Sequence, residues 1–141
     1  MPISYGPKSR AAIAELDGRL QRLLDRYADA ADASLDLTII VGHRGEAAQN
    51  AAFAAGASKL AWPHSKHNSL PSKAFDFVPY PFAGGSKEWN DLARFARIAG
   101  ALKVIANQER IAIRWGGDWD GDGRVVGDET FIDAGHVELL A

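Results

Sequence analysis

The sequence has 141 residues, of which 47% are apolar and 24% are charged, and its formal net charge is −2. These values are typical of one globular domain with a substantial core and exclude a disordered or fibrous chain. The near-neutral charge and scattered basic residues argue against a nucleic-acid partner, and the lack of cysteine excludes disulfides, thiolate zinc sites and cysteine nucleophiles.

The first part of the chain predicts two helices and one strand. Between positions 13 and 27, apolar residues recur at three- and four-residue steps, as in a surface helix with one buried stripe. Residues 35–41 (LDLTIIV) are rich in β-branched side chains and are followed by Gly42, which predicts a strand. An alanine-rich stretch over 46–55, closed by Gly56, predicts a short helix.

Arg44 lies at the carboxyl end of the predicted strand 35–41, in the turn before the short helix. An arginine in this place can hold a carboxylate ligand, such as a carboxylate of the substrate. It can equally be a surface residue paired with Glu46, and the sequence pattern alone leaves both interpretations open.

The second part of the chain predicts a further helix and several strands. Residues 74–80 form a strand that ends at prolines, and Ser86 caps a long helix whose apolar face runs to position 105. A strand is expected over 111–115, and segments 131–132 and 136–140 are expected as a closing pair of strands. The pattern predicts the α+β class, with helices over a small, mainly antiparallel sheet that carries the site.

Two segments sixty-odd residues apart offer the side chains of a metal site. His67 is followed nine positions later by Asp76, and His136 is preceded three positions earlier by Asp133. Two imidazoles and one carboxylate, with a water in the fourth position, make an open zinc site of the catalytic kind, and a further carboxylate would be free to act as base. His64 lies three residues before His67, and local pattern does not choose between them.

A second metal loop is predicted over residues 118–129. Carboxylates stand at its positions 1, 3 and 5, a glycine at position 6 and a glutamate at position 12, as in a twelve-residue calcium loop. The predicted calcium ligands are Asp118, Asp120, Asp122, the backbone carbonyl of Arg124, and Glu129. The flanking segments read as strands and not as the helices of an EF-hand; the alternative is a solvated acidic turn.

Three segments together resemble the zinc peptidases of the M15 family. They are Ser65-x-His67 with Ala74-x-Asp76, Asp133-x-x-His136-x-Glu138, and the run Gly42-x-Arg44 with Gln49. The run WGGDW at 115–119 is similar to that of the endolysin branch. The sequence departs from the family in a longer interval between His67 and Asp76, and in His43 where an aromatic residue often stands.

The resemblance implies an M15/hedgehog-like fold and a role for each matching residue. It implies that His67, Asp76 and His136 bind zinc and that Asp133 is the catalytic carboxylate. It also implies that Arg44 positions the substrate and that Ser65 shapes the site.

The function implied is that of a phage endolysin-like endopeptidase that hydrolyses the L-Ala–D-Glu bond of peptidoglycan stem peptides. We expect one zinc peptidase domain over 1–141, with the calcium-type loop 118–129 inserted and regulating it. The alternatives are a D-Ala-D-Ala carboxypeptidase or dipeptidase of the same family, and a non-catalytic calcium-dependent wall-binding module.

The chain is expected to be a monomer. It is also expected not to insert into membranes, because no apolar stretch reaches the roughly 20 residues that a spanning helix needs. Residues 1–10 show no secretory signal pattern. We therefore expect the protein to stay in the host cytoplasm until lysis and then to act on the cell wall.

Overall fold

A computed structural model describes residues 3–119, 121 and 132–140. The helices and strands, with η for a 3-10 helix, are α1 (Pro7–Ile13), α2 (Gly18–Ala30), η1 (Ala33–Leu35), β1 (Leu37–Val41), α3 (Glu46–Ala54), η2 (Lys66–Asn68), β2 (Ala74–Pro79), α4 (Ser86–Trp89), α5 (Leu92–Gln108), β3 (Ile113–Trp115) and β4 (His136–Leu139). The predicted α+β class is confirmed, because helices flank one antiparallel sheet. Within the described residues, no helix has the length and apolar character needed to cross a membrane.

The sheet has the strand order β1-β2-β4-β3, and every neighbouring pair is antiparallel. The register sets Asp76 of β2 opposite His136 of β4, and Arg114 of β3 opposite Glu138 of β4. Opposite residues of neighbouring strands point to the same face, with Cβ atoms roughly 4.5–5.5 Å apart. Strand pairing alone therefore brings together two predicted metal ligands that are 60 residues apart in the chain.

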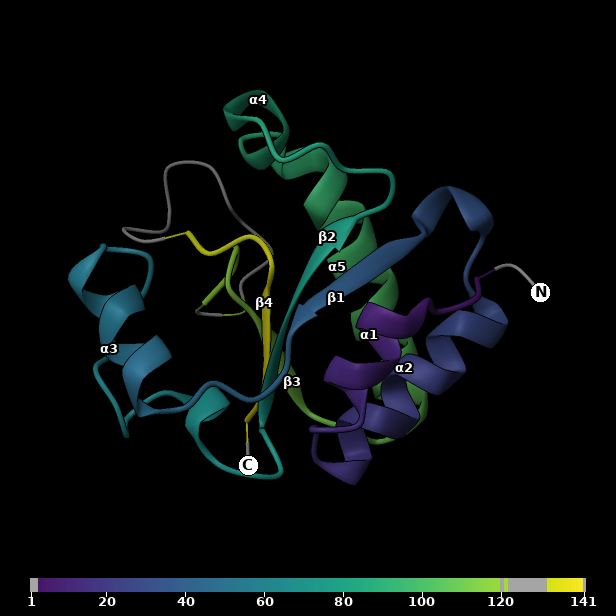
Figure 1. Ribbon diagram of the computed structural model, residues 1–141. Helices are drawn as coiled ribbons and strands as arrows, with labels where there is room; N and C mark the ends of the chain where they lie inside the picture. The colour runs from purple at the N-terminus through teal and green to yellow at the C-terminus, as the bar shows by residue number, and fades with distance from the viewer. Residues whose placement is uncertain (1–2, 120, 122–131, 141) are drawn as a thin grey trace.

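The hydrophobic core lies on one face of the sheet and the predicted metal ligands on the other. Phe75 and Phe77 of β2 are fully buried, and the ring of Phe77 lies 5.7 Å from that of Phe95 on α5. Because side chains alternate along a strand, Asp76 between them points to the opposite face. Figure 1 shows α1, α2 and α5 on one side of the strands and α3 on the other.

Aspartate N-caps begin new helices at two places where the apolar pattern predicts no break. The helix expected from Ser86 to position 105 is two helices, because Asp91 caps α5 by accepting a hydrogen bond from the backbone N–H of Arg94. In the same way Asp17 caps α2 and separates it from α1. Of the strand expected at 131–132, Ile132 lies outside any strand, and residue 131 is outside the described part of the chain.

The turn before β4 packs closely on the end of β3. The backbone N–H of Asp133 donates to the carbonyl of Gly116 at 2.9 Å, and the indole N–H of Trp115 donates to the carbonyl of Ala134 at 2.6 Å. A Cβ atom at Gly116 would overlap the carbonyl oxygen of Asp133, so glycine is required at this close approach. The tryptophan–glycine pair thus holds the turn that presents Asp133 and His136.

Candidate metal centre

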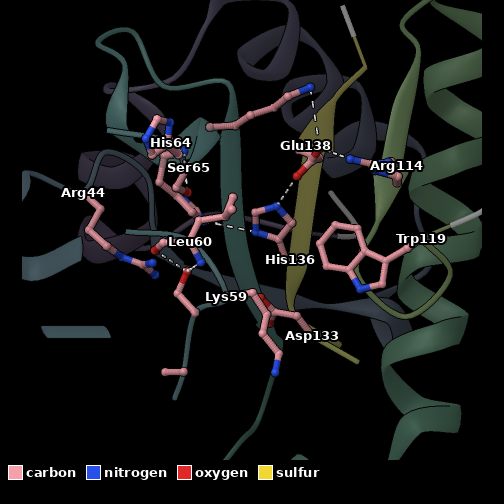
Figure 2. A pocket seen from close by; sticks show the side chains of 14 residues that line it. Arg44, Lys59, Leu60, His64, Ser65, Arg114, Trp119, Asp133, His136 and Glu138 are labelled. Atoms are coloured by element: carbon pink, nitrogen blue, oxygen red, sulfur yellow. Dashed lines mark hydrogen bonds and ion pairs between the residues drawn. The ribbon is translucent and has the colours of Figure 1, made fainter. Parts of the chain in front are cut away.

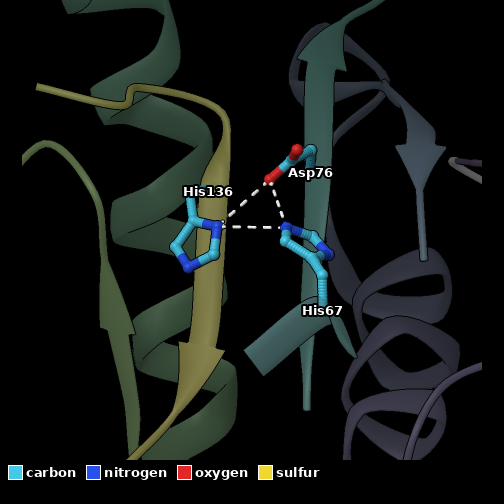
Figure 3. Close-up of side chains that lie close together, drawn as sticks. All are labelled: His67, Asp76 and His136. Carbon is cyan, nitrogen blue, oxygen red and sulfur yellow. Dashed lines mark hydrogen bonds and ion pairs between the residues drawn. The ribbon is translucent and has the colours of Figure 1, made fainter. Parts of the chain in front are cut away.

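Three side chains from separate segments converge on one point of the sheet face (Figure 3). His67 Nε2 lies 3.0 Å from Asp76 Oδ1 and 3.2 Å from His136 Nδ1, and the last two atoms are 3.2 Å apart. His67 comes from η2, Asp76 from β2 and His136 from β4. The structure therefore brings together all three predicted zinc ligands.

Each histidine has one ring nitrogen that faces the other two side chains, called the inner nitrogen, and one that faces away, called the outer nitrogen. The hydrogen bond of the outer nitrogen determines whether the inner nitrogen carries a proton. His67 Nδ1 lies 2.8 Å from the carbonyl oxygen of Gly42, and His136 Nε2 lies 2.8 Å from Glu138 Oε1. Both oxygens are acceptors, so each outer nitrogen carries a proton. The neutral form of each ring then has a bare inner nitrogen, and these two nitrogens face a carboxylate oxygen. Three acceptors at one point favour a cation between them, which can be a metal ion or, in the metal-free protein, a proton on one of the rings.

The size and chemistry of this triangle fit zinc. Bonds of about 2.0–2.1 Å to a tetrahedral ion place neighbouring ligand atoms roughly 3.3 Å apart, close to the 3.0–3.2 Å found here. Two imidazole nitrogens and one carboxylate oxygen suit zinc better than calcium or magnesium. His67 is 1% and His136 6% exposed, so the site is shielded and preformed.

The short helix η2 settles which of two nearby histidines faces the site. His67 is buried there, whereas His64 is exposed on the rim of the cavity. Ser65, the residue expected to shape the site, caps η2 by accepting a hydrogen bond from the backbone N–H of His67 at 3.2 Å. Asn68 completes a capping box with Ser65. Ser65 thus acts on the site by fixing the backbone that carries His67.

Arg44 lies in the centre but contacts a metal ligand. Its Nη2 donates to Asp76 Oδ2 at 3.2 Å and its Nη1 donates to Gln49 Oε1 at 3.1 Å. Among the described residues Arg44 is paired with Asp76 and not with Glu46, so the surface pair that the sequence left open is not formed. Each of the three ligands therefore has a hydrogen-bonded partner outside the site, which orients metal ligands and tunes their affinity.

Gln49 is a fully buried hub that connects this arginine to the rest of the site. Its Oε1 accepts from Arg44 and from Asn68, and its Nε2 donates to Ser58 Oγ and to the carbonyl of Leu60. Arg44, the loop that carries His67, and the loop before it are thereby joined. The sequence analysis assigned Gln49 no role beyond its place in the motif with Arg44. A polar amide within an alanine-rich helix was the feature that could have indicated its buried position.

Asp133 is a carboxylate beside the ligands that has a different electrostatic environment. In the metal-free protein, burial and the nearby charge of Asp76 raise its pKa to about 6. Within the described part of the chain, Asp133 makes no ion pair. A carboxylate that exchanges its proton near neutral pH is suited to act as a general base.

Glu138, in contrast, is held ionised. Burial opposes its charge, but hydrogen bonds from His136 and Arg114 prevail and lower its pKa to about 2. Burial likewise opposes the charge of His136, whose hydrogen bonds to Asp76 and Glu138 raise its pKa to about 9 in the metal-free protein. In the metal-free protein, burial also opposes the charge of Asp76, but its interactions with protonated His136 and with His67 keep its pKa well below its usual range. Glu138 was assigned no role from sequence, although its position two residues after His136 predicts the same strand face.

The centre opens into a cavity of about 560 Å³ (Figure 2). Asp133 and His136 lie at its middle, Arg44 and Leu60 on one side, and Arg114 and Trp119 on the other. The indole of Trp119 lies 5.5 Å from the His136 ring. The cavity is large enough to admit part of a peptide to the ligands and to Asp133.

Most of the predicted calcium loop lies outside the described residues. Asp120, Asp122, Arg124 and Glu129 belong to that part. Asp118 is described: it is 7% exposed, and its backbone N–H donates to the carbonyl of Trp115 at 3.0 Å. The calcium site therefore stays a prediction.

Comparisons with known proteins agree along the whole chain. The family model of phage L-alanyl-D-glutamate peptidases matches residues 1–140. The L-alanyl-D-glutamate peptidase of Escherichia phage T5 is 32% identical over 144 residues, covering 99% of this chain and 100% of the phage protein. The structure of the Serratia marcescens L-Ala D-Glu endopeptidase ChiX matches with a TM-score of 0.69 and 26% identity, over 96% of this chain and 88% of that one. These matches include both segments that supply the metal centre.

Proposed function

The chain belongs to the phage L-alanyl-D-glutamate peptidases, and from this premise we propose that it is a zinc endopeptidase that hydrolyses the L-Ala–D-Glu bond of peptidoglycan stem peptides. The observation that carries the proposal is the convergence of one ring nitrogen from each of His67 and His136 with a carboxylate oxygen of Asp76, in a cavity that Asp133 also lines. The resemblance found in the sequence is confirmed at the level of the family and its peptidase activity.

The residues divide the work of hydrolysis between holding a metal and moving a proton. His67, Asp76 and His136 would hold zinc, which supplies Lewis acidity to the scissile carbonyl and lowers the pKa of a water molecule to about 7. Asp133 takes the proton of the attacking water and passes it to the leaving amine. The place of Asp133 in the same cavity as His136 supports this role, because the carboxylate must reach both the attacking water and the leaving amine.

Arg44 and Ser65 would support the reaction by position. Arg44 holds Asp76 through Nη2, and it also lines the cavity, where its remaining N–H groups can donate to substrate oxygens. Ser65 fixes the turn at His67. We regard both as positioning residues, with substrate contact as an additional role of Arg44.

Digestion of purified peptidoglycan tests the bond that is cut. Mass spectrometry should find new amino-terminal D-Glu on the released peptides and L-Ala left on the glycan. Release of free D-Ala would instead assign the chain to the carboxypeptidases, and binding without any cleavage would make it a wall-binding module. His136→Ala protein is the control for contaminating peptidase, since it lacks a ligand.

Calcium regulation is a second part of the proposal, supported by the spacing of acidic residues over 118–129. The loop begins directly after the WGG turn, and its second residue, Trp119, packs on the ring of His136. Calcium bound to the loop would therefore act on a zinc ligand through Trp119. A calcium-selective chelator should lower activity without removing zinc, and Glu129→Ala should do the same. Full activity of Glu129→Ala, with no calcium binding by calorimetry, would leave only an acidic turn.

The setting proposed for this activity is phage lysis. The one domain over 1–141 would act as a monomer on the cell wall after accumulating in the host cytoplasm. Fractionation of infected cells before and after lysis, with light scattering of the purified protein, tests both statements.

A further inference from the structure

Glu138 gathers two cations from opposite directions onto one of its oxygens. Its Oε2 accepts from Arg114 Nη2 at 2.8 Å and lies 3.5 Å from Lys66 Nζ, while Oε1 is occupied by His136. Lys66 also donates to the carbonyl of Leu139, which keeps its ammonium group at this end of the cavity. Figure 2 shows the bonds of Glu138 to Arg114 and His136 at one end of the cavity.

The charges at this end do not balance. Two cations share one carboxylate, and His136 is neutral when it binds a metal, so one positive charge is in excess among the described residues around Glu138. The Glu138 side chain is 9% exposed, whereas those of Lys66 and Arg114 are 32% and 38% exposed and line the cavity. The excess charge therefore faces the space that a substrate would enter. On the other side of the ligands, Arg44 is matched by Asp76.

Arg114 is held ready for a further acceptor. Its guanidinium lies 5.2 Å over the ring of Trp119, and Glu138 fixes its Nη2. Its Nε is buried without a hydrogen-bond partner among the described residues, so protein oxygens do not saturate the group. A planar guanidinium held from two directions binds a carboxylate with little further loss of side-chain freedom.

The substrate named by the proposed function, on which this inference rests, is charged on one side only. Before the scissile bond stand L-Ala and its amide to the muramyl lactyl group, which are both neutral. After it stands D-Glu, which continues the stem through its γ-carboxyl and so leaves its α-carboxylate free. The next diamino acid can carry a second free carboxylate.

We propose that Lys66 and Arg114 form a subsite for a free carboxylate of the stem peptide on the leaving-amine side. The D-Glu residue and its successors then run toward β3 and the end of β4, and the muramyl side runs toward segment 57–60. This subsite makes the enzyme selective for stems whose carboxylate is not amidated, because a neutral amide cannot form the charge-assisted bonds.

Matched synthetic substrates test the subsite in the wild-type enzyme. A muramyl stem peptide with D-Glu is compared with the same peptide carrying D-isoglutamine, and kcat/KM is measured for both. We expect the D-Glu peptide to be cut about tenfold more efficiently, the scale of one charge-assisted hydrogen bond. A second pair, with the diamino-acid carboxylate free or amidated, shows which carboxylate is bound. Equal values within both pairs would overturn the subsite, and failure to cut any of the peptides would overturn the proposed function itself.

Variants locate the preference in the cavity. Lys66→Met and Arg114→Met should bring the ratio of the two kcat/KM values close to one, whereas Arg114→Lys should keep part of it. The matched control is Lys59→Met, which removes a cation from the other wall of the same cavity and should leave the ratio unchanged. Zinc content is measured for each variant. The assignment to Lys66 and Arg114 is wrong if Lys66→Met and Arg114→Met lower kcat/KM for both peptides by the same factor. It is also wrong if Lys59→Met alone removes the preference for the D-Glu peptide.

Discussion

Two arginine–carboxylate pairs flank the metal centre, and they differ in how far the carboxylate lies from the metal position. In the pair on β2, Arg44 binds Asp76, which is itself a ligand. In the pair across β3 and β4, Arg114 binds Glu138, which reaches the site only through the ring of His136. The first arginine is matched by its carboxylate, whereas the second shares Glu138 with Lys66. Similar ion pairs can therefore serve a metal ligand in one place and a substrate charge in another.

Asp133 is a third carboxylate at the site and extends this comparison. Unlike Asp76 and Glu138, it has no arginine partner in the described part of the chain. The pKa values of Asp76 and Glu138 are lowered by their donors, whereas that of Asp133 is raised to about 6. Carboxylates whose environments push their pKa values apart have separate roles. Here two are fixed anions that hold groups in place, and one can move a proton.

The largest effect is expected where the carboxylate is itself the ligand. Asp76→Asn should abolish stoichiometric zinc binding and activity, because it removes a ligand charge and the partner of Arg44 together. Glu138→Gln should retain zinc with affinity about 10- to 100-fold weaker, the usual cost of changing an outer partner. Zinc competition with a chromophoric chelator measures both. Equal loss in the two variants would remove the distinction between the two pairs.

Removal of the unpaired carboxylate should affect turnover and not metal binding. Asp133→Ala is expected to fold, to bind zinc and to lose at least about 10²-fold in kcat, the scale of positioned acid–base catalysis. Single-turnover kinetics and zinc analysis on the same preparation check this. Near-normal hydrolysis by zinc-loaded Asp133→Ala would take Asp133 out of the mechanism.

How far the sequence predicted these roles depends on whether the partners are local. His67, Asp76, His136 and Asp133 were expected because short motifs carry them, and the strand pattern around Asp76 and His136 was enough to place both on the sheet. The subsite at Glu138 was not predicted, because its partners Lys66 and Arg114 come from a 3-10 helix and another strand. Only the fold brings these residues together. The helix break at Asp91 was missed for the opposite reason: an apolar pattern continued across a local capping signal.

The stability of the metal-free protein should show a pH dependence that zinc removes. The pKa of His136 is raised to about 9 by Asp76 and Glu138, above the unfolded value of about 6.5. Protonated His136 therefore adds stability that is complete below about pH 6.5 and is lost as the pH rises through 9. We expect the Tm of metal-free protein to fall by on the order of a few degrees over this range.

Zinc removes this trend because it binds neutral imidazole and releases the proton of His136. The rise in Tm on adding zinc should therefore grow from pH 6.5 to pH 9. Calorimetric scans with and without zinc, in buffers of matched ionic strength, measure the two trends. A zinc-induced rise in Tm that is the same at both pH values would contradict the raised pKa of His136.

The smallest effect should distinguish the two arginines themselves. Arg44 uses two nitrogens at once, Nη2 for Asp76 and Nη1 for Gln49, and a lysine can replace only one of these bonds while keeping the charge. Arg44→Lys should therefore keep zinc and lower kcat/KM about threefold for D-Glu and D-isoglutamine peptides alike, since Arg44 serves the ligand. Arg114→Lys should lower kcat/KM mainly for the D-Glu peptide, because there the arginine faces the substrate. A loss confined to the D-Glu peptide in Arg44→Lys would reverse the two assignments and place the substrate carboxylate on the β2 side of the metal centre.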